Sequence, residues 1–152
     1  MSRMNLSINI NASPETVFAI VSDIDGERAK ASGLEKVEIL TDGPVGVGTR
    51  WREIHAMNDR ETVEEMEVTA FEHPHFYSAH SDSQGFDVDW TMRVDPKGQG
   101  SKLTLDMTST PRTLAAKFKA PVAWLMTGMM KKMVAKDLEK IKTYIEQQAV
   151  PA

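Results

Sequence analysis

The chain of 152 residues contains no cysteine. It can therefore form neither a disulfide nor a cysteine-ligated metal site, and it has no thiol nucleophile. It also lacks any run of 18 or more apolar residues, which argues against a transmembrane helix. The first residues lead into an alternating segment rather than a continuous apolar stretch. We therefore expect no signal peptide and a cytoplasmic location.

In contrast to cysteine, methionine is abundant in this sequence. The sequence has ten methionines, and four of them, Met126, Met129, Met130 and Met133, fall within eight positions. Apolar residues make up 41% of the chain and charged residues 26%, as is usual for one globular domain, so we expect a single domain over residues 1–152. Because methionine is unbranched and polarizable, the cluster suits an adaptable apolar surface.

The net charge of −4 hides an asymmetry along the chain. Residues 111–148 carry eight basic and three acidic side chains, whereas the rest carries ten basic and nineteen acidic ones. The acidic part argues against a nucleic-acid partner. The basic segment fits either an amphipathic helix on an anionic membrane or partner, or a helix with its lysines in water. We favour the second and expect no stable membrane insertion.

The order of elements follows from the hydrophobic periodicity. Residues 6–10 alternate as a strand, Ser13 and Pro14 start a short helix, and a second short helix follows near residues 27–31. Residues 34–110 read as six strands joined by short turns, an antiparallel meander. After Pro111 the pattern is helical. We expect a short segment over 112–119 to break there and a long helix to start at Pro121. The simplest packing wraps the sheet around that helix, an α+β architecture.

Four strings carry a family resemblance: INASPETVFAIVSDID, VEILTDGPVGVGTRWRE, EVTAFEHPHFYSAHS and SKLTLDMTST. With the element order, they resemble the START-like, or SRPBCC, superfamily with its helix-grip fold, nearest to the polyketide cyclase/dehydrase-like branch of small bacterial proteins. The resemblance implies about seven curved antiparallel strands around a long C-terminal helix, two short helices after the first strand, and a cavity between sheet and helix. The superfamily spans carriers and enzymes, so the fold does not settle the function.

We expect the cavity to bind a hydrophobic small molecule or lipid in a monomer or homodimer, without a metal or another cofactor. Mostly apolar walls with a few polar anchors are typical of such cavities. The predicted lining comprises Trp51, Met66, Val68, Phe76, Trp90, Met92, Met126, Met129 and Met133, with Glu53, His55 and His80 as polar contacts and Phe118 and Val122 as a lid.

An enzymatic alternative rests on Glu53 and His55. They are two residues apart on one strand and share a face with Trp51. A buried carboxylate and imidazole can form an acid/base pair for cyclisation or dehydration. We favour binding without catalysis, and the sequence leaves open whether this face or that of Arg50 and Arg52 lines the cavity. A third alternative is a membrane-associated or partner-binding accessory module.

Other motifs are weaker. Gly43, Gly46 and Gly48 are not followed by the Gly-Lys-Ser/Thr of a phosphate loop, which favours a glycine-rich hairpin. Alternation places His75 and His80 on opposite faces of a strand, so we expect no metal site. The sequence has no Gly-x-Ser-x-Gly motif for a serine nucleophile.

Overall fold

The computed structural model describes residues 2–34, 36–57, 60–83 and 85–149, with side chains described except at 2, 55–57, 60, 62, 83, 115–127, 129–130 and 149. The elements are β1 (Ser2–Ile10), α1 (Pro14–Val21), α2 (Glu27–Ser32), β2 (Lys36–Ile39), β3 (Arg50–Met57), β4 (Arg60–Glu72), β5 (Phe76–Ser83), β6 (Phe86–Lys97), β7 (Gly100–Pro111) and α3 (Leu114–Ala149). All strands pair antiparallel in one sheet of order β1-β7-β6-β5-β4-β3-β2. This confirms the predicted helix-grip fold.

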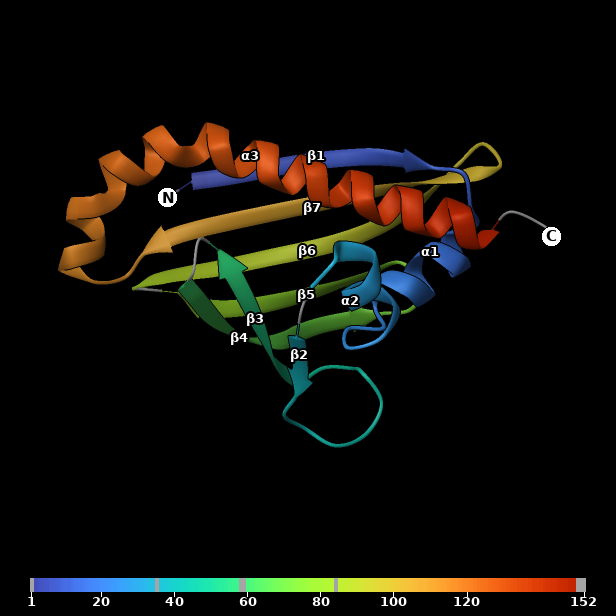
Figure 1. Cartoon of the computed structure of the whole chain (residues 1–152), viewed down its shortest axis with the longest axis horizontal. Helices are drawn as coiled ribbons and strands as arrows, with labels where there is room; N and C mark the ends of the chain where they lie inside the picture. Colours follow the sequence, from blue (N-terminus) through green and yellow to red (C-terminus); the bar gives the residue numbers. More distant parts are fainter. Residues whose placement is uncertain (1, 35, 58–59, 84, 150–152) are drawn as a thin grey trace.

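All three helices lie on one side of the curved sheet. α3 runs along β1, and α1 and α2 cover the same side near the C-terminal half of α3 (Figure 1). We call this side the inner face. No helix in the described part of the chain combines the length and the apolarity needed to cross a bilayer.

The first helix begins where the sequence predicts. The Ser13 hydroxyl accepts a hydrogen bond from the Thr16 backbone N–H at 3.2 Å, and Pro14 occupies the first turn. The next helix, α2, ends at Gly33, whose φ of 68° is a left-handed conformation that glycine adopts without strain. α1 buries Val17 and Phe18 in the core. α2 directs Arg28 toward Glu53 of β3.

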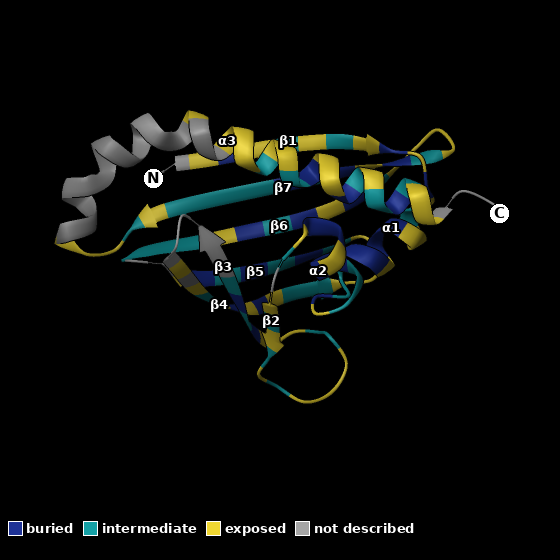
Figure 2. Ribbon diagram, in the orientation of Figure 1, coloured by how far each residue is buried: buried dark blue, intermediate teal, exposed yellow. Residues whose placement is uncertain are grey.

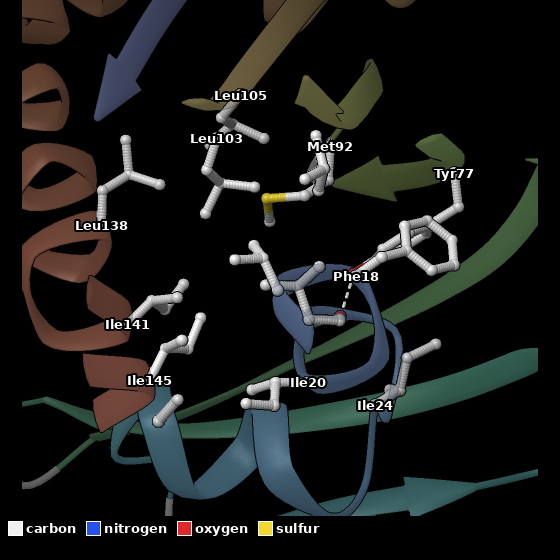
Figure 3. Close-up of a cluster of buried hydrophobic side chains, with 14 of the residues drawn as sticks. Phe18, Ile20, Ile24, Tyr77, Met92, Leu103, Leu105, Leu138, Ile141 and Ile145 are labelled. Atoms are coloured by element: carbon white, nitrogen blue, oxygen red, sulfur yellow. Dashed lines mark hydrogen bonds between the residues drawn. The ribbon is translucent and has the colours of Figure 1, made fainter. Parts of the chain in front are cut away.

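The core lies between the sheet, α1 and the C-terminal half of α3. Ile141 and Ile145 of α3 are fully buried and lie opposite Leu103 of β7 and Ile20 of α1 (Figure 3). Packed side chains therefore fill the region between the inner face of the sheet and the C-terminal half of α3.

The last helix differs from the prediction. α3 is continuous from Leu114 to Ala149, so the predicted break before Pro121 is wrong. A proline removes one backbone donor and crowds the preceding turn, but a long helix can absorb this as a local bend instead of ending. The sequence Asn58-Asp59-Arg60 also predicts a tight turn between β3 and β4, and residues 58–59 of it lie outside the described residues.

Candidate functional site

The inner face is closed at one end and accessible at the other. Along β6, Val94, Met92 and Trp90 are 1%, 2% and 6% exposed, whereas Val88, the next inward residue, is half-buried. The same trend appears on β7, where Leu103 is fully buried and Met107 is half-buried. Figure 2 shows both strands changing from buried to intermediate toward the end where β7 leads into α3. Apolar surface on the inner face is therefore reachable by solvent near the start of α3.

Three large aromatic side chains lie on the buried half of this face. The rings of Trp51 on β3 and Trp90 on β6 are 6.1 Å apart in an edge-to-face arrangement, and Tyr77 on β5 lies 5.4 Å from Trp90. Strand alternation places all three on the inner face, with Ala79 directly opposite Trp90 in the register. They form an aromatic floor that extends across β3, β5 and β6.

A buried ion pair stands over this floor. Arg28 Nη1 of α2 donates to Glu53 Oε1 of β3 at 2.9 Å, and Trp51 Nε1 donates to the same oxygen at 3.1 Å. The guanidinium also lies 5.6 Å from the centre of the Trp90 ring. Arg28 and Glu53 are 9% and 4% exposed. Burial alone lowers the pKa of Arg28, but Tyr77, which ionises before Arg28 loses its proton, and Glu53 outweigh it and hold that pKa above its usual range, so the guanidinium stays charged.

Two further titratable groups approach the pair. Burial raises the pKa of the Asp137 carboxyl on α3, and the nearby Arg28 only partly offsets this. Burial also raises the pKa of Tyr77 to about 12, and its hydroxyl donates to the Val21 carbonyl at 2.7 Å. Tyr77 is thus a neutral donor, and the interior combines one strong cation with carboxyl groups from two elements.

The structure answers the question of which β3 face is inside. Trp51 and Glu53 point inward, whereas Arg52 points outward and lies 3.8 Å from Glu38 and 3.9 Å from Glu65. The other predicted lining residues that are buried on the inner face are Met66, Val68, Trp90 and Met92. Contact of these residues with a ligand stays a prediction.

Phe76 and His80 lie on the opposite face of β5, so the predicted inward placement of both is wrong. The Phe76 ring packs under the Arg93 guanidinium at 4.9 Å, and His80 Nδ1 lies 2.9 Å from Asp89 Oδ1. Tyr77 and Ala79 are the buried residues instead. In this strand, adjacent residues of similar size and polarity occupy both faces, so alternation could not fix which face is inside.

Met133 is 54% exposed, which also differs from its predicted place in the lining. It precedes the buried Leu138 by five residues, and five residues turn an α-helix by about 140° beyond one full turn. The stripe that buries Leu138 therefore leaves Met133 on the solvent side. The remaining predicted contacts, at His55, Phe118, Val122, Met126 and Met129, lie outside the described side chains.

Sequence reasoning missed Arg28, Tyr77 and Asp137. Arg28 stands in a short polar helix whose sequence gives no sign of which residue turns inward. Tyr77 was missed because the adjacent aromatic residue, Phe76, was assigned to the inner face instead. Asp137 immediately precedes Leu138, which belongs to the predicted apolar stripe of the helix and is buried. This position beside the stripe was the one indication in the sequence that Asp137 lies near the core.

The glycine motif before β3 has a structural explanation. Gly43 and Gly48 have φ angles of 91° and 93°, a left-handed conformation that favours glycine, so they shape the loop before β3. No group of three or more histidine and acidic side chains in the described ranges is arranged to hold a metal ion.

Comparisons with known proteins agree on the fold. The profile of the family described as "Polyketide cyclase / dehydrase and lipid transport" matches residues 1–146. No curated protein matches the sequence. Among solved structures, TTHA0849 from Thermus thermophilus has a TM-score of 0.78 at 18% identity, over 98% of this chain and 100% of that one. Ara h 8.0201 has a TM-score of 0.77 at 15% identity, over 96% and 98%.

A third structure is the di-domain ARO/CYC BexL from the BE-7585A biosynthetic pathway. Its TM-score is 0.77 at 15% identity, over 99% of this chain and 48% of that one. Identities this low establish the fold alone.

Proposed function

Because the chain belongs to the polyketide cyclase/dehydrase and lipid-transport family, we propose that it binds a hydrophobic small molecule or lipid between the inner face of its sheet and α3. The observation that carries the proposal is the burial gradient along β6 and β7. Trp90 is closely packed, whereas Val88, the next inward residue on β6, and Met107, the partner of Trp90 on β7, stay partly open to solvent. A bound apolar molecule would remove this surface from water.

The proposed lining starts from the buried half of the inner face and extends to the accessible end. The buried part of the lining consists of Trp51, Met66, Val68, Trp90 and Met92, and the accessible end adds Val88 and Met107. Met126 and Met129 of α3 complete the proposed lining from the helix side, with Phe118 and Val122 as the proposed lid. Met92 and Met107 are close neighbours on adjacent strands, since Met92 pairs with Leu105 and Met107 pairs with Trp90. Such flexible thioether side chains adapt to ligands of differing shape.

Catalysis is the less favoured alternative. Glu53 Oε1 already accepts hydrogen bonds from Arg28 and Trp51, which suits a fixed structural acceptor better than a base that must take up a proton from a substrate. Acid/base chemistry by Glu53 and His55 therefore stays a prediction, as do the cytoplasmic location and the monomeric or homodimeric state.

Native mass spectrometry after mild purification tests the proposed function. We expect a co-purified apolar molecule, and uptake of Nile red once that molecule is removed. Val88→Arg places a charge at the accessible end of the inner face and should abolish dye uptake. Thr91→Arg lies on the opposite face of the same strand and is the matched control. Absence of both an adduct and dye uptake in the unmodified protein would overturn the proposal.

A further inference from the structure

The buried ion pair leaves one donor unused. Arg28 Nε has no hydrogen-bond partner among the described residues, although the atom is buried. The guanidinium is held in place by Glu53 on one side and by the Trp90 ring beneath it. An unpaired buried donor costs free energy comparable to a lost hydrogen bond, so such a group calls for an acceptor.

The charges around Arg28 restrict what that acceptor can be. Glu53 already pairs with the guanidinium, and Glu64 stands directly opposite Glu53 in the β3–β4 register, on the same face of the sheet. Asp137 approaches from α3, close enough to affect Arg28 electrostatically. Carboxyl groups on three elements thus accompany one guanidinium. Desolvating a carboxylate ligand would cost a large free energy, because it is an ion, and these carboxyl groups would repel it. Desolvating a neutral oxygen costs much less, and the carboxyl groups do not repel it.

A second unused polar atom lies on the same face. Ser81 of β5 is 5% exposed, and its hydroxyl has no hydrogen-bond partner in the described part of the chain. In the register Ser81 pairs with Met66, and Met66 pairs with Trp51. Ser81 therefore lies two strand spacings, about 10 Å, from the tryptophan that also holds Glu53. It pairs with Val88 on its other side, at the accessible end of the inner face.

We propose that Arg28 Nε donates a hydrogen bond to a neutral carbonyl or hydroxyl oxygen of the ligand, and that Ser81 offers a second polar contact toward the accessible end. This inference rests on the proposed function and narrows its ligand class. The ligand is an apolar molecule with an uncharged oxygen at one end, and a free fatty-acid anion is disfavoured. Arg28 and Ser81 then decide specificity, while the aromatic floor supplies apolar contact.

Three naphthalene probes that differ in one substituent test this. They are prodan, which carries a propionyl ketone, its propyl analogue without the oxygen, and 6-(dimethylamino)-2-naphthoate. Fluorescence titration of the unmodified protein should show prodan binding about tenfold or more tighter than either of the other two, the effect of one hydrogen bond from a charged donor. Equal affinity of the propyl analogue, or equal or tighter binding of the naphthoate, would overturn the inference while leaving the proposed function standing. Failure of all three probes to bind would overturn the inference, and the proposed function would fall with it if the unmodified protein also shows neither a co-purified adduct nor Nile red uptake.

A variant assigns the effect to Arg28. Arg28→Lys keeps a cation for Glu53 but has a methylene where Nε stood, so the advantage of prodan over the propyl analogue should fall to within about threefold. Arg52→Lys, on the outer face of β3, is the matched control and should preserve the full ratio. An unchanged ratio in Arg28→Lys would overturn the assignment.

A second variant, at Ser81, tests the site even if Arg28→Lys fails to fold. Ser81→Ala should weaken prodan by about threefold, because the Ser81 hydroxyl can donate a hydrogen bond to the dimethylamino nitrogen at the end of prodan opposite its ketone. Ser78→Ala, where the hydroxyl pairs with Thr91 on the outer face at 2.7 Å, should leave probe affinity unchanged. Equal affinities in the two serine variants would remove Ser81 from the site.

Discussion

Arg28 and Glu53 form a buried ion pair of 2.9 Å that joins α2 to β3 across the interior. Removing one partner leaves an uncompensated charge in a poorly solvated place. Arg28→Ala or Glu53→Ala alone should therefore lower the free energy of unfolding by about 3–5 kcal/mol, and the double variant Arg28→Met/Glu53→Leu should lose much less. Urea unfolding followed by circular dichroism measures all three.

Arg52→Ala is the control for this comparison. Its contacts with Glu38 and Glu65 at 3.8 and 3.9 Å are solvated, so its effect should stay below about 1 kcal/mol. Single variants at the buried pair no more costly than Arg52→Ala would show that water reaches the pair and screens it.

Asp137 makes stability depend on pH in the direction opposite to most carboxyl groups. Because burial raises its pKa in the folded state, the folded protein binds the proton more tightly than the unfolded chain. Its contribution is therefore most favourable at low pH and is lost as the pH rises from the ordinary value near 3.8 through the raised value. Asp137→Asn should remove this loss, so unfolding at pH 7 should require more urea than in the unmodified protein.

Asp106→Asn gives the comparison of opposite sign. The Arg3 guanidinium, 2.9 Å away, holds the pKa of Asp106 below its usual range, so its contribution is present at neutral pH and is lost on acidification. At pH 7 we expect Asp106→Asn to be less stable than the unmodified protein and Asp137→Asn to be more stable. As the pH falls, each variant's difference in the free energy of unfolding from the unmodified protein should approach zero, from the negative side for Asp106→Asn and from the positive side for Asp137→Asn. Differences of the same sign at pH 7 would refute the assignment for Asp137.

Tyr77 connects the aromatic floor to α1 through a single hydrogen bond. Its hydroxyl donates to the Val21 carbonyl at 2.7 Å in a buried setting, so Tyr77→Phe should cost about 1–3 kcal/mol by leaving that carbonyl without its donor. Tyr144→Phe is the matched change at a half-buried position, where the hydroxyl bonds Glu27 and water can replace it. Thermal unfolding should rank Tyr77→Phe clearly below Tyr144→Phe, and the reverse order would contradict the role given to Tyr77.

Much of the fold was predictable because several of its segments have an unambiguous hydrophobic period. On β6, apolar residues from Phe86 to Val94 alternate strictly with polar ones, so the strand and its inner face follow from the sequence alone. The capping pair Ser13 and Pro14 likewise fixed the start of α1. The continuity of α3 through Pro121 was not predictable in the same way, since a proline can end a helix or only bend it, and the tertiary packing decides between the two.

The candidate site was only partly predictable for a related reason. Trp51 and Glu53 were placed on one strand face because alternate residues of a strand point to the same side, and both are buried there. Arg28 was missed because the charge of an arginine in a short polar helix normally lies in water, and only the meeting of α2 with β3 shows that it is buried. Long-range pairing of polar groups leaves no periodic signature in a sequence.

Ligand binding should change backbone protection on one half of the sheet. The inward residues Val88 and Met107 are half-buried, whereas Val94 and Leu103 at the opposite end are already packed. A molecule seated over the accessible end should therefore slow amide hydrogen exchange in residues 86–90 and 105–109 and leave residues 92–95 and 101–104 unchanged. Exchange with and without saturating prodan, followed by mass spectrometry, measures this. Slowing confined to residues 92–95 and 101–104 would place the ligand elsewhere, because that half of the inner face is filled by Ile141 and Ile145 of α3.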